Sequence, residues 1–578
     1  MRIGLLTEGG YPYVGGDAGL WCERLVRGLE QHEFDVYALG VGPRRQAGGH
    51  RLPLPPQVRR VRTAPPWTAE GPTYGRRARR RFAECYEELA GAVCTRAGAT
   101  GGAPGAEAPQ EPRSLADRFG SALYGLAELA REKGGLAGAL RSDIAVRALE
   151  RACRAPRALC AAHEARVPDL LTIAAHLERA LRPLSLDWYH DDALGAADLC
   201  HATTGGPPAL CGLLARHFCG VPLLVTEYAV HLRTHYLTSG PHTAAPAVRA
   251  VLAAFHGRLT AEVYRAAELL TAGDAHARRW QERCGADGAR IRTVYPGTAA
   301  ERFAEAGEPA PRTDPGTLVW AGPADPAKDL ETLLYAFTEV HREEPRTRLR
   351  IVGTPAGPEG AAYLGHCRTL AERLFPDATE DDHPVSIEET GPSKETGETD
   401  GTGATGERRE TGGTGEADAY AAGSVVVLSG GAEGFPAGLV EAMLSGRATV
   451  SADVGAVAEV IGGTGLVVPP HDPGALAEAC VALLRDPERR ARLGAAARAR
   501  ALELFTVERN TTAFHGIYLE IASRCPVRRV AQDEPRPFAA PAESLVPGHW
   551  TGPEDRSMPR GVPAWTADST QPPVEEAR

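Results

Sequence analysis

The chain has 578 residues, which is too long for one hydrophobic core and indicates two large domains with additional segments. Its formal net charge of −10 gives no support for nucleic acid as a general partner. The twelve cysteines are scattered without any C-x-x-C pair, which favours free thiols in a reducing cytoplasm over a disulfide framework or a zinc site. No run of about eighteen apolar residues is present, so we expect a soluble cytoplasmic protein without a membrane span.

The first forty residues follow the pattern of a βαβ unit. Strands over residues 2–7 (RIGLLT) and 35–41 (DVYALGV) flank a helix over residues 20–32, and a right-handed crossover makes such strands parallel neighbours. The loop before the helix, EGGYPYVGGDAG, is rich in glycine but lacks the G-x-G-x-x-G spacing. This difference speaks against a nicotinamide-dependent dehydrogenase.

A Pro/Arg-rich segment over residues 48–75 precedes a long helical segment. Residues 76–184 are rich in Ala, Leu and Arg with helical periodicity, interrupted by the low-complexity run GATGGAPGAEAPQEP. We interpret them as a helical insertion in the first domain. The insertion opens with RRARRR, the one strong basic cluster of the chain. A solvated helix face explains this cluster, and contact with an anionic membrane surface or an acidic ligand is the alternative that stays open.

Two α/β series make up the rest of the chain. In the first, the strand-like runs ADLCHATT, PLLVTEY and LLTAG are each followed by a helix-like segment, and AGEPAPRTDPG reads as a linker. The second begins at TLVWAG and ends beyond GLVVPP. We therefore predict two doubly wound α/β domains, residues 1–305 and 316–525, that face one another across a cleft. An insert over about residues 389–418 and the tail over residues 526–578 lack apolar residues able to join a core, so we expect both to be disordered.

Two glutamates flank a short turn in the stretch GGAEGFPAGLVEAML, residues 430–444. The preceding run GSVVVLS is typical of a buried parallel strand, so Glu433 lies at the carboxyl end of a strand and Glu441 in the following helix. Pro436 suits the first helical turn, and the free N–H groups of residues 434–437 would suit a diphosphate. Glu441 could then bind a ribose diol and Glu433 the hydroxyls of a sugar. For an isolated pair at this spacing, ordinary surface and turn residues are the more frequent explanation.

The surrounding segments resemble a known family. The second domain contains AGPADPAKDLETLLYAF, RLRIVG, GGAEGFPAGLVEAMLSGRATVSADVGAVAEVI and GLVVPPHDPGALAEA, which are similar to family 4 retaining glycosyltransferases of the GT-B fold. In the first domain, LLTEGGYPYVGGDAGLWCERLV, HATTGGPPALCGLLA, LLVTEYAVHLRTHYL and TVYPGTAAERF resemble the PelF-like branch, whose N-terminal region of the DUF3492 type also carries a helical insertion. The resemblance covers most of residues 1–524, except for the Gly/Thr/Glu-rich insert.

The resemblance implies an enzyme of polysaccharide biosynthesis. It would move a hexosyl unit from a nucleotide diphosphate sugar to a saccharide or glycoconjugate acceptor, with retention and without a metal or other cofactor. Lys328 and Glu433 would be the catalytic residues, with Lys328 on the donor diphosphate, Glu433 on the transferred sugar and Glu441 on the ribose. The full donor site implied in this way is Gly15, Gly16, Lys328, Glu433, Gly434, Phe435, Pro436 and Glu441. The acceptor side of the cleft would be lined by His201, Glu227 and Arg233.

The sequence departs from the family pattern at two positions. The diphosphate-binding arginine of the family falls at Pro323, and the histidine after LLVTE is Tyr228, with His231 and His235 nearby. The proline at position 323 keeps open a non-catalytic GT-B protein that binds a nucleotide sugar or a partner. A sugar-nucleotide epimerase, which also uses two Rossmann-like domains, is a second alternative, and the E-x7-E and Gly-Phe-Pro arrangement argues against it. The spacing of the two histidines would place both rings on one helix face. The sequence shows no intervening glutamate and no evident third ligand, so we expect no metal site there.

Overall fold

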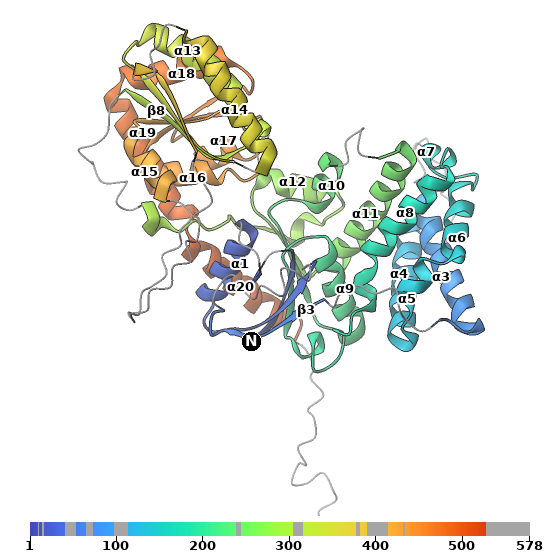
Figure 1. Ribbon diagram of the computed structural model, residues 1–578. Coiled ribbons are helices and arrows are strands. Elements are labelled where there is room, and N and C mark those ends of the chain that lie inside the picture. Colours follow the sequence, from blue (N-terminus) through green and yellow to red (C-terminus); the bar gives the residue numbers. More distant parts are fainter. Residues whose placement is uncertain are drawn as a thin grey trace, which may run out of the picture. The chain divides into compact units, whose positions relative to one another are not determined.

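The computed structural model of the chain describes residues 1–9, 11–13, 17–40, 54–64, 73–96, 114–238, 244–303, 316–355, 357–376, 382–389, 414–431 and 434–526. Within these ranges the fold consists of two parallel β-sheets, each with helices packed on both faces (Figure 1). The predicted doubly wound α/β architecture is therefore confirmed. Most of the predicted linker, residues 390–413 of the predicted disordered insert and the tail from residue 527 lie outside the described residues.

The first sheet has seven strands in the order β3-β2-β1-β4-β5-β6-β7, and every neighbouring pair is parallel. Side chains along β1 alternate between the two faces, so Ile3 and Leu5 join one core cluster while Leu6 joins another. The strand order reverses between β1 and β4, which is where open α/β sheets bind ligands at the carboxyl ends of their strands. The strands are β1 (Arg2–Glu8), β2 (Glu33–Leu39), β3 (Val58–Thr63), β4 (Leu199–Ala202), β5 (Leu223–Glu227), β6 (Leu269–Ala272) and β7 (Ile291–Thr293).

Strand β3 is not among the strands that the sequence predicts, because residues 48–75 read only as a Pro/Arg-rich segment. It lies at the edge of the sheet, and its residues are only partly buried, so it lacks the continuous apolar run of a central strand. One of its arginines, Arg60, lies with Nε 3.3 Å from Oδ1 of the buried Asp35 on β2. An edge strand that carries charges in this way is hard to recognise from hydrophobic periodicity alone.

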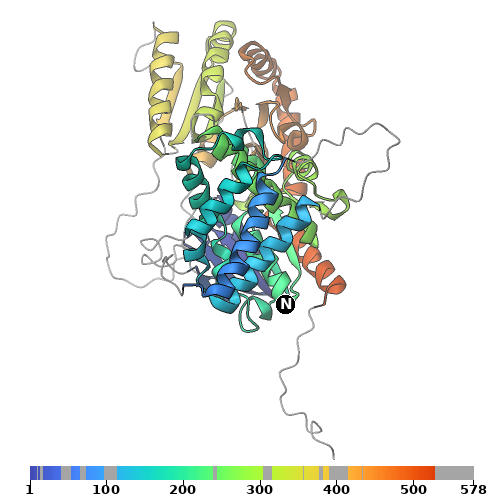
Figure 2. The ribbon, with the colours of Figure 1, turned by 90° about the vertical axis from the view of Figure 1, so that its right-hand side faces the viewer.

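The helices around the first sheet include the long helical segment between β3 and β4. That segment packs as a group beside the sheet and is seen face on in Figure 2. Its buried aromatic residues Phe82, Tyr86 and Phe119 belong to the same core cluster as strand residues of the sheet. The segment consists of α3 (Arg76–Cys94), α4 (Leu115–Lys133), α5 (Leu136–Leu140), α6 (Asp143–Cys153), α7 (Cys160–His163), α8 (Val167–Ala180), η1 (Arg182–Ser185) and η2 (Leu194–Ala196). The other helices before the second sheet are α1 (Asp17–Gly28), α9 (Pro207–Cys219), α10 (His231–Thr238), α11 (Pro246–Ala266), α12 (Ala275–Arg283), η3 (Gly288–Arg290) and η4 (Ala300–Phe303), of which η4 packs into a core cluster of the second sheet.

The second sheet has six parallel strands in the order β10-β9-β8-β11-β12-β13. Alternate residues of β8 point to opposite faces, so Leu318 and Trp320 join one core cluster and Val319 and Ala321 the other. The strands are β8 (Thr317–Ala324), β9 (Arg348–Pro355), β10 (Val385–Glu389), β11 (Val425–Leu428), β12 (Ala448–Ala452) and β13 (Leu466–Val468). The helices are η6 (Pro326–Lys328), α13 (Leu330–Glu343), α14 (Gly357–Leu374), α15 (Thr414–Ala422), α16 (Ala437–Leu444), α17 (Val457–Ile461), α18 (Pro473–Arg485) and α19 (Pro487–Leu504). Helix α15 begins inside the insert that the sequence predicts to be disordered.

The last described helix, α20 (Val507–Arg524), returns to the first sheet. Its buried residues Phe514, Ile517 and Tyr518 belong to the core cluster that contains Ile3 and Leu5 of β1. Residues 507–524 thus share a core with the first sheet, although they follow the second sheet in the chain.

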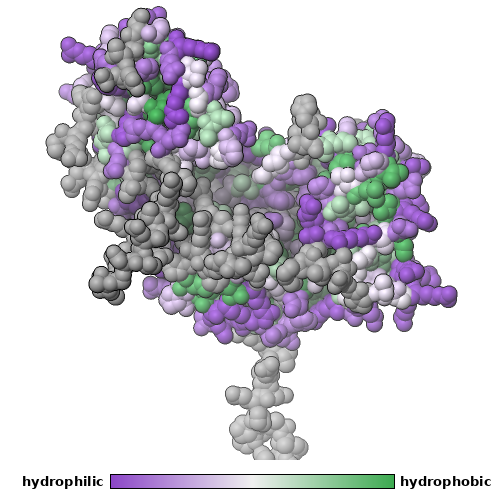
Figure 3. Space-filling model, in the orientation of Figure 1, coloured by the Kyte–Doolittle hydropathy of each residue, from purple (hydrophilic) through white to green (hydrophobic). Residues whose placement is uncertain are grey.

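The surface drawn in Figure 3 is largely hydrophilic, with hydrophobic patches of limited extent between charged residues. Among the exposed large hydrophobic residues are Val167 and Leu171 on α8 and Tyr236 and Leu237 on α10. None of the helices in the described part of the chain combines the length and the hydropathy that a bilayer-spanning helix requires.

Candidate active site

Lys328 lies in a tight turn at the carboxyl end of β8. Asp325 starts the turn by accepting a hydrogen bond from the N–H of Ala327 (2.7 Å), and its carbonyl accepts one from the N–H of Lys328 (3.0 Å). Asp329 ends the turn in the left-handed conformation (φ 49°) and caps α13 by accepting from the N–H and the hydroxyl of Thr332. Lys328 is one of only three lysines among 64 basic residues, so a lysine at this motif position stands out from the composition.

The loop that carries the E-x7-E motif lies directly against this turn. The hydroxyl of Ser429, just after β11, donates to the carbonyl of Lys328 (3.0 Å), and the N–H of Gly431 donates to the carbonyl of Ala327 (2.9 Å). The carboxyl ends of β8 and β11 are thereby joined at one edge of the sheet. Glu433 lies outside the described residues, as do Gly15 and Gly16 in the first domain. The roles that the resemblance implies for these three residues stay predictions.

Glu441 is the one ionisable residue of α16. Leu439, Val440, Ala442 and the two residues after it are fully buried, whereas Glu441 is half-buried. Burying a carboxylate in so apolar a helix would be costly, and Glu441 accordingly stays half-buried. The ribose-binding role that the resemblance implies for Glu441 stays a prediction.

The start of α16 differs in detail from the anion site that the sequence suggests. Pro436 precedes the first helical residue, and the N–H of Ala437 donates to the carbonyl of Phe435 (3.0 Å), so it is already used within the loop. The ring of Phe435 packs against a core cluster of the second sheet. Within the described ranges, the N–H groups of Gly434 and Phe435 donate to no acceptor, in contrast to that of Ala437.

His471 is a site residue that the sequence analysis does not single out. It follows β13 in the left-handed conformation (φ 57°), and its Nδ1 lies 2.7 Å from Oδ2 of Asp329. Its side chain is 67% exposed, so the ring is accessible to a ligand. A Cβ atom at Gly431 would lie 2.6 Å from Cε1 of His471, so the glycine makes room for the ring. The sequence carries one signal for this site, the glycine pair 430–431 after β11. His471 and Asp329 lie far apart in the chain, so no local pattern links them.

Pro323, the position of the family's arginine, lies in β8 opposite Thr354 of β9 and has an exposed side chain. It offers neither a charge nor an N–H donor. The basic residues described above at this edge are Lys328 and His471.

His201, which the resemblance places on the acceptor side, has no exposed surface in the described structure. Its ring nitrogens are hydrogen-bonded to the hydroxyl of Tyr518 on α20 (2.8 Å) and to that of Thr226 on β5 (2.7 Å). Burial lowers the pKa of His201 to about 3, so the ring is neutral at physiological pH. Any effect of His201 on a ligand would pass through these neighbours.

Glu227 lies at the carboxyl end of β5 and is 1% exposed. Its carboxylate accepts hydrogen bonds from the hydroxyl of Tyr264 (2.5 Å), the N–H of His231 (3.0 Å) and the amide of Gln281 (3.2 Å). Burial raises the pKa of Glu227 above its ordinary value, while these bonds act in the opposite direction. The carboxylate thereby joins the strand to α10, α11 and α12.

Tyr228 follows Glu227 directly in the chain and Arg233 lies on α10, and both residues are partly buried. The guanidinium of Arg233 lies 5.9 Å from the ring centre of Trp280, and the hydroxyl of Tyr228 accepts a hydrogen bond from the amide of Asn510 (3.0 Å). The acceptor-side roles of His201, Glu227 and Arg233 stay predictions.

The histidines of α10 pack against a third histidine, His256 on α11. The ring centres of His235 and His256 lie 4.3 Å apart, and those of His231 and His256 lie 5.4 Å apart. Burial lowers the pKa of all three. Within the described ranges, no three His, Cys, Asp or Glu side chains are grouped so that they could hold a metal ion.

Comparison with known families covers both halves of the chain. Residues 1–289, half of the chain, match the family described as "Domain of unknown function (DUF3492)". The chain belongs to this DUF3492 family. Residues 394–486 match a second family, "Glycosyl transferases group 1", so this member combines the two.

Curated relatives of this DUF3492 protein are glycosyltransferases. It is 32% identical over 270 residues to D-inositol 3-phosphate glycosyltransferase of Kineococcus radiotolerans, and the aligned region covers 42% of this chain and 56% of the relative. It is 30% identical over 247 residues to D-inositol 3-phosphate glycosyltransferase 2 of Catenulispora acidiphila, and the aligned region covers 40% of this chain and 52% of the relative. The chain therefore spans about half the length of these relatives.

Solved structures show the same fold. The Anabaena protein Alr3699/HepE in complex with UDP has a TM-score of 0.51 at 14% identity, with 89% of this chain and 99% of that chain covered. Sucrose-phosphate synthase from Thermosynechococcus elongatus has a TM-score of 0.50 at 17% identity, with 90% and 99% covered. The DUF3492 protein thus has the GT-B fold of glycosyltransferases, as the sequence predicts.

Proposed function

We propose that this protein is a glycosyltransferase that moves a hexosyl unit from a nucleotide diphosphate sugar to a saccharide or glycoconjugate acceptor with retention. The observation that carries the proposal is the junction of the Lys328 turn with the loop before α16, which brings a lysine to the same sheet edge as the half-buried Glu441. This edge is where doubly wound sheets bind nucleotides. The match of residues 394–486 to the glycosyl transferases group 1 family supports the same reaction class.

In the proposed complex, the donor diphosphate lies against Lys328 and the N–H groups of Gly434 and Phe435. His471 adds a second positive charge when protonated, and its hydrogen bond to Asp329 holds the ring in place. The ribose hydroxyls bind Glu441, and the transferred sugar binds Glu433. Because the side chains supply the positive charge, we propose that transfer needs no metal ion.

The proposed transfer takes place on one face of the sugar. The bond between the anomeric carbon and the diphosphate oxygen breaks, and the acceptor oxygen forms its bond to the same carbon from the same side. The acceptor proton passes to an oxygen of the leaving diphosphate, so no protein base is required. The protein then acts by positioning both substrates and stabilising the charge that develops on the leaving group.

A non-catalytic nucleotide-sugar binding protein is the second candidate, and Pro323 is the observation that favours it. With a neutral side chain in place of the arginine, less charge is available to stabilise the leaving diphosphate. An epimerase is the third candidate, and the placement of the E-x7-E loop against the Lys328 turn argues against it.

The test is a panel of nucleotide sugars measured by thermal unfolding and then by product analysis. A donor at a hundred times its dissociation constant should stabilise the fold by about 2.7 kcal/mol. Transfer to an acceptor with retained anomeric configuration would support the proposal. Binding without transfer to any acceptor would favour the binding protein, and an epimer formed without acceptor would favour the epimerase. If no nucleotide sugar raises the melting temperature, the proposal that this site binds a donor is wrong.

A further inference from the structure

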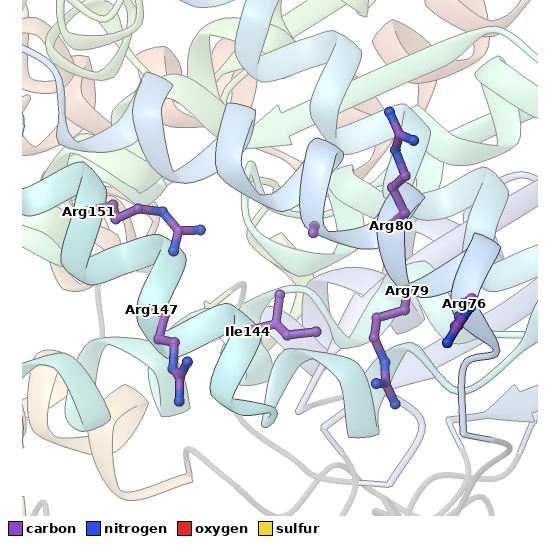
Figure 4. Close-up of a pocket in the computed structure, with 7 residues that line it drawn as sticks. Arg76, Arg79, Arg80, Ile144, Arg147 and Arg151 are labelled. Carbon is purple, nitrogen blue, oxygen red and sulfur yellow. The ribbon is translucent and has the colours of Figure 1, made fainter.

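A groove between α3 and α6 in the helical segment is lined by arginines from both helices. Its volume is about 330 Å³, within the range of small-molecule sites. The lining residues are Arg76, Arg79, Arg80 and Ala83 of α3 and Ile144, Arg147 and Arg151 of α6. In Figure 4, Arg79 and Arg147 extend from their helices on either side of Ile144 and point in the same direction, whereas Arg80 points the opposite way.

A second cavity of about 460 Å³ adjoins this groove and shares Arg79, Ile144 and Arg147 with it. Its other walls include the aromatic residues Tyr74 and Phe82, whose ring centres lie 6.1 Å apart. The hydroxyl of Tyr74 is buried and has no hydrogen-bond partner among the described residues. The two cavities together therefore offer a cationic end and an aromatic end with an unused polar atom.

The arginines of the groove are only partly neutralised. Arg80 pairs with Glu84, Arg151 with Glu87 of the facing helix, and Arg147 with Asp143 at the limit of an ion pair (4.0 Å). Within the described ranges, Arg76 and Arg79 have no carboxylate within ion-pair distance. The groove is therefore locally positive, although the chain as a whole has a formal net charge of −10.

The arrangement is unfavourable for the fold itself. Arginines three and four residues apart on one helix repel each other, as Arg76 does with Arg79 and Arg80, and Arg147 with Arg151. Three of them also lie at the N-terminal end of α3, where the helix dipole is positive and Gly75 provides no side-chain cap. Because these arginines are exposed, burial of a core does not require them. A bound anion would remove both sources of repulsion.

We propose that the two cavities form a binding site for a phosphorylated molecule, with its phosphate between Arg79 and Arg147 and its attached body against Tyr74. Paired guanidinium groups match the oxygen geometry of phosphate. The phosphate can belong to a soluble metabolite or to a lipid headgroup. The site lies on the helical segment and uses none of the residues proposed to bind the sugar donor.

The test compares two full-length double variants. Arg79→Gln with Arg147→Gln removes the two charges that both cavities share. Arg157→Gln with Arg179→Gln removes two other exposed arginines of the same helical segment that line neither cavity. Both pairs are made in a Lys328→Ala background, so that the proposed donor site contributes little. The probes are inorganic pyrophosphate, measured by calorimetry, and vesicles of phosphatidylcholine with or without phosphatidylglycerol, measured by flotation.

We expect the parent protein to bind one of the two probes, and the groove variant to bind it at least tenfold more weakly while the control variant changes less than twofold. Saturable pyrophosphate binding would indicate a soluble ligand, and binding only to phosphatidylglycerol vesicles would indicate a lipid headgroup. The melting temperature of the groove variant should stay unchanged or rise, because like-charge repulsion is relieved. Equal weakening in both variants, or no binding of either probe, would overturn the proposal.

Discussion

The indole N–H of Trp21 on α1 donates a hydrogen bond to the side-chain oxygen of Asn510 on α20, 489 residues later in the chain (3.3 Å). The amide of Asn510 in turn donates to the hydroxyl of Tyr228 (3.0 Å) and to the carbonyl of Tyr295 (2.6 Å). Asn510 is only 4% exposed, so this one side chain satisfies three groups away from water. It joins the last described helix to the first sheet.

Replacing Asn510 by Ala should therefore destabilise the protein strongly. The change leaves Trp21, Tyr228 and the carbonyl of Tyr295 without their partner, and the expected loss is about 2–4 kcal/mol of unfolding free energy. Urea denaturation measures it, with Thr512→Ala, an exposed position on the same helix, as the control. Equal stabilities of the two variants would mean that water replaces Asn510 without cost.

His201 should make the stability depend on pH. Burial lowers its folded-state pKa from 6.5 to about 3, so between these values the unfolded chain binds a proton that the folded chain does not. The stability contributed in this way is present above pH 6.5 and is lost as the pH falls, by about 2 kcal/mol between pH 7 and pH 5.

His201→Gln should flatten that pH dependence by about one proton, whatever its effect on the stability at pH 7. Denaturation curves at pH 5 and pH 7 for both proteins give the comparison. His256, whose pKa burial also lowers to about 3, acts in the same direction and remains in both proteins. If the two slopes are the same, His201 titrates normally in the folded state.

Glu441→Gln should weaken binding of the best nucleotide sugar by about 1.5–3 kcal/mol, because a charge-assisted hydrogen bond to the ribose is lost. Glu433→Gln should act in the same direction through the sugar hydroxyls. Glu478→Gln, an exposed glutamate on α18, is the matched control and should leave the affinity unchanged. Calorimetric titration with the nucleotide sugar measures the affinity of each variant. Unchanged affinity in both site variants would mean that the E-x7-E glutamates do not bind the donor.

Pro323→Arg should tighten donor binding by about 1–3 kcal/mol, because it restores a charge-assisted contact to the diphosphate. Pro323→Gln removes the same proline without adding charge and should have little effect. Lys328→Ala should nearly abolish binding, and His471→Gln should weaken it. If Pro323→Arg binds the donor no more tightly and the natural protein transfers sugar rapidly, another cation already contacts the diphosphate. His471 and Arg233 are the candidates.

The sequence by itself was sufficient for the two doubly wound sheets and for the loop between β11 and α16 that carries the E-x7-E motif. Continuous apolar runs such as RIGLLT and SVVVLS correspond to β1 and β11, because burial on both faces of a parallel sheet leaves a signal in each strand separately. The place of the E-x7-E loop after a strand follows from the same local pattern, whereas Lys328 is singled out by the family resemblance. Strand β3 was missed because an edge strand with arginines lacks that signal.

Only the tertiary structure decided which distant segments meet. The amphipathic pattern of α20 shows that one face is buried, but not that it packs on the first sheet, where Asn510 contacts Trp21. The contact between His471 and Asp329, and the groove that Arg79 and Arg147 line together, likewise join residues of separate elements. Periodicity records whether a side chain is buried, whereas the identity of its partner depends on how the whole chain packs.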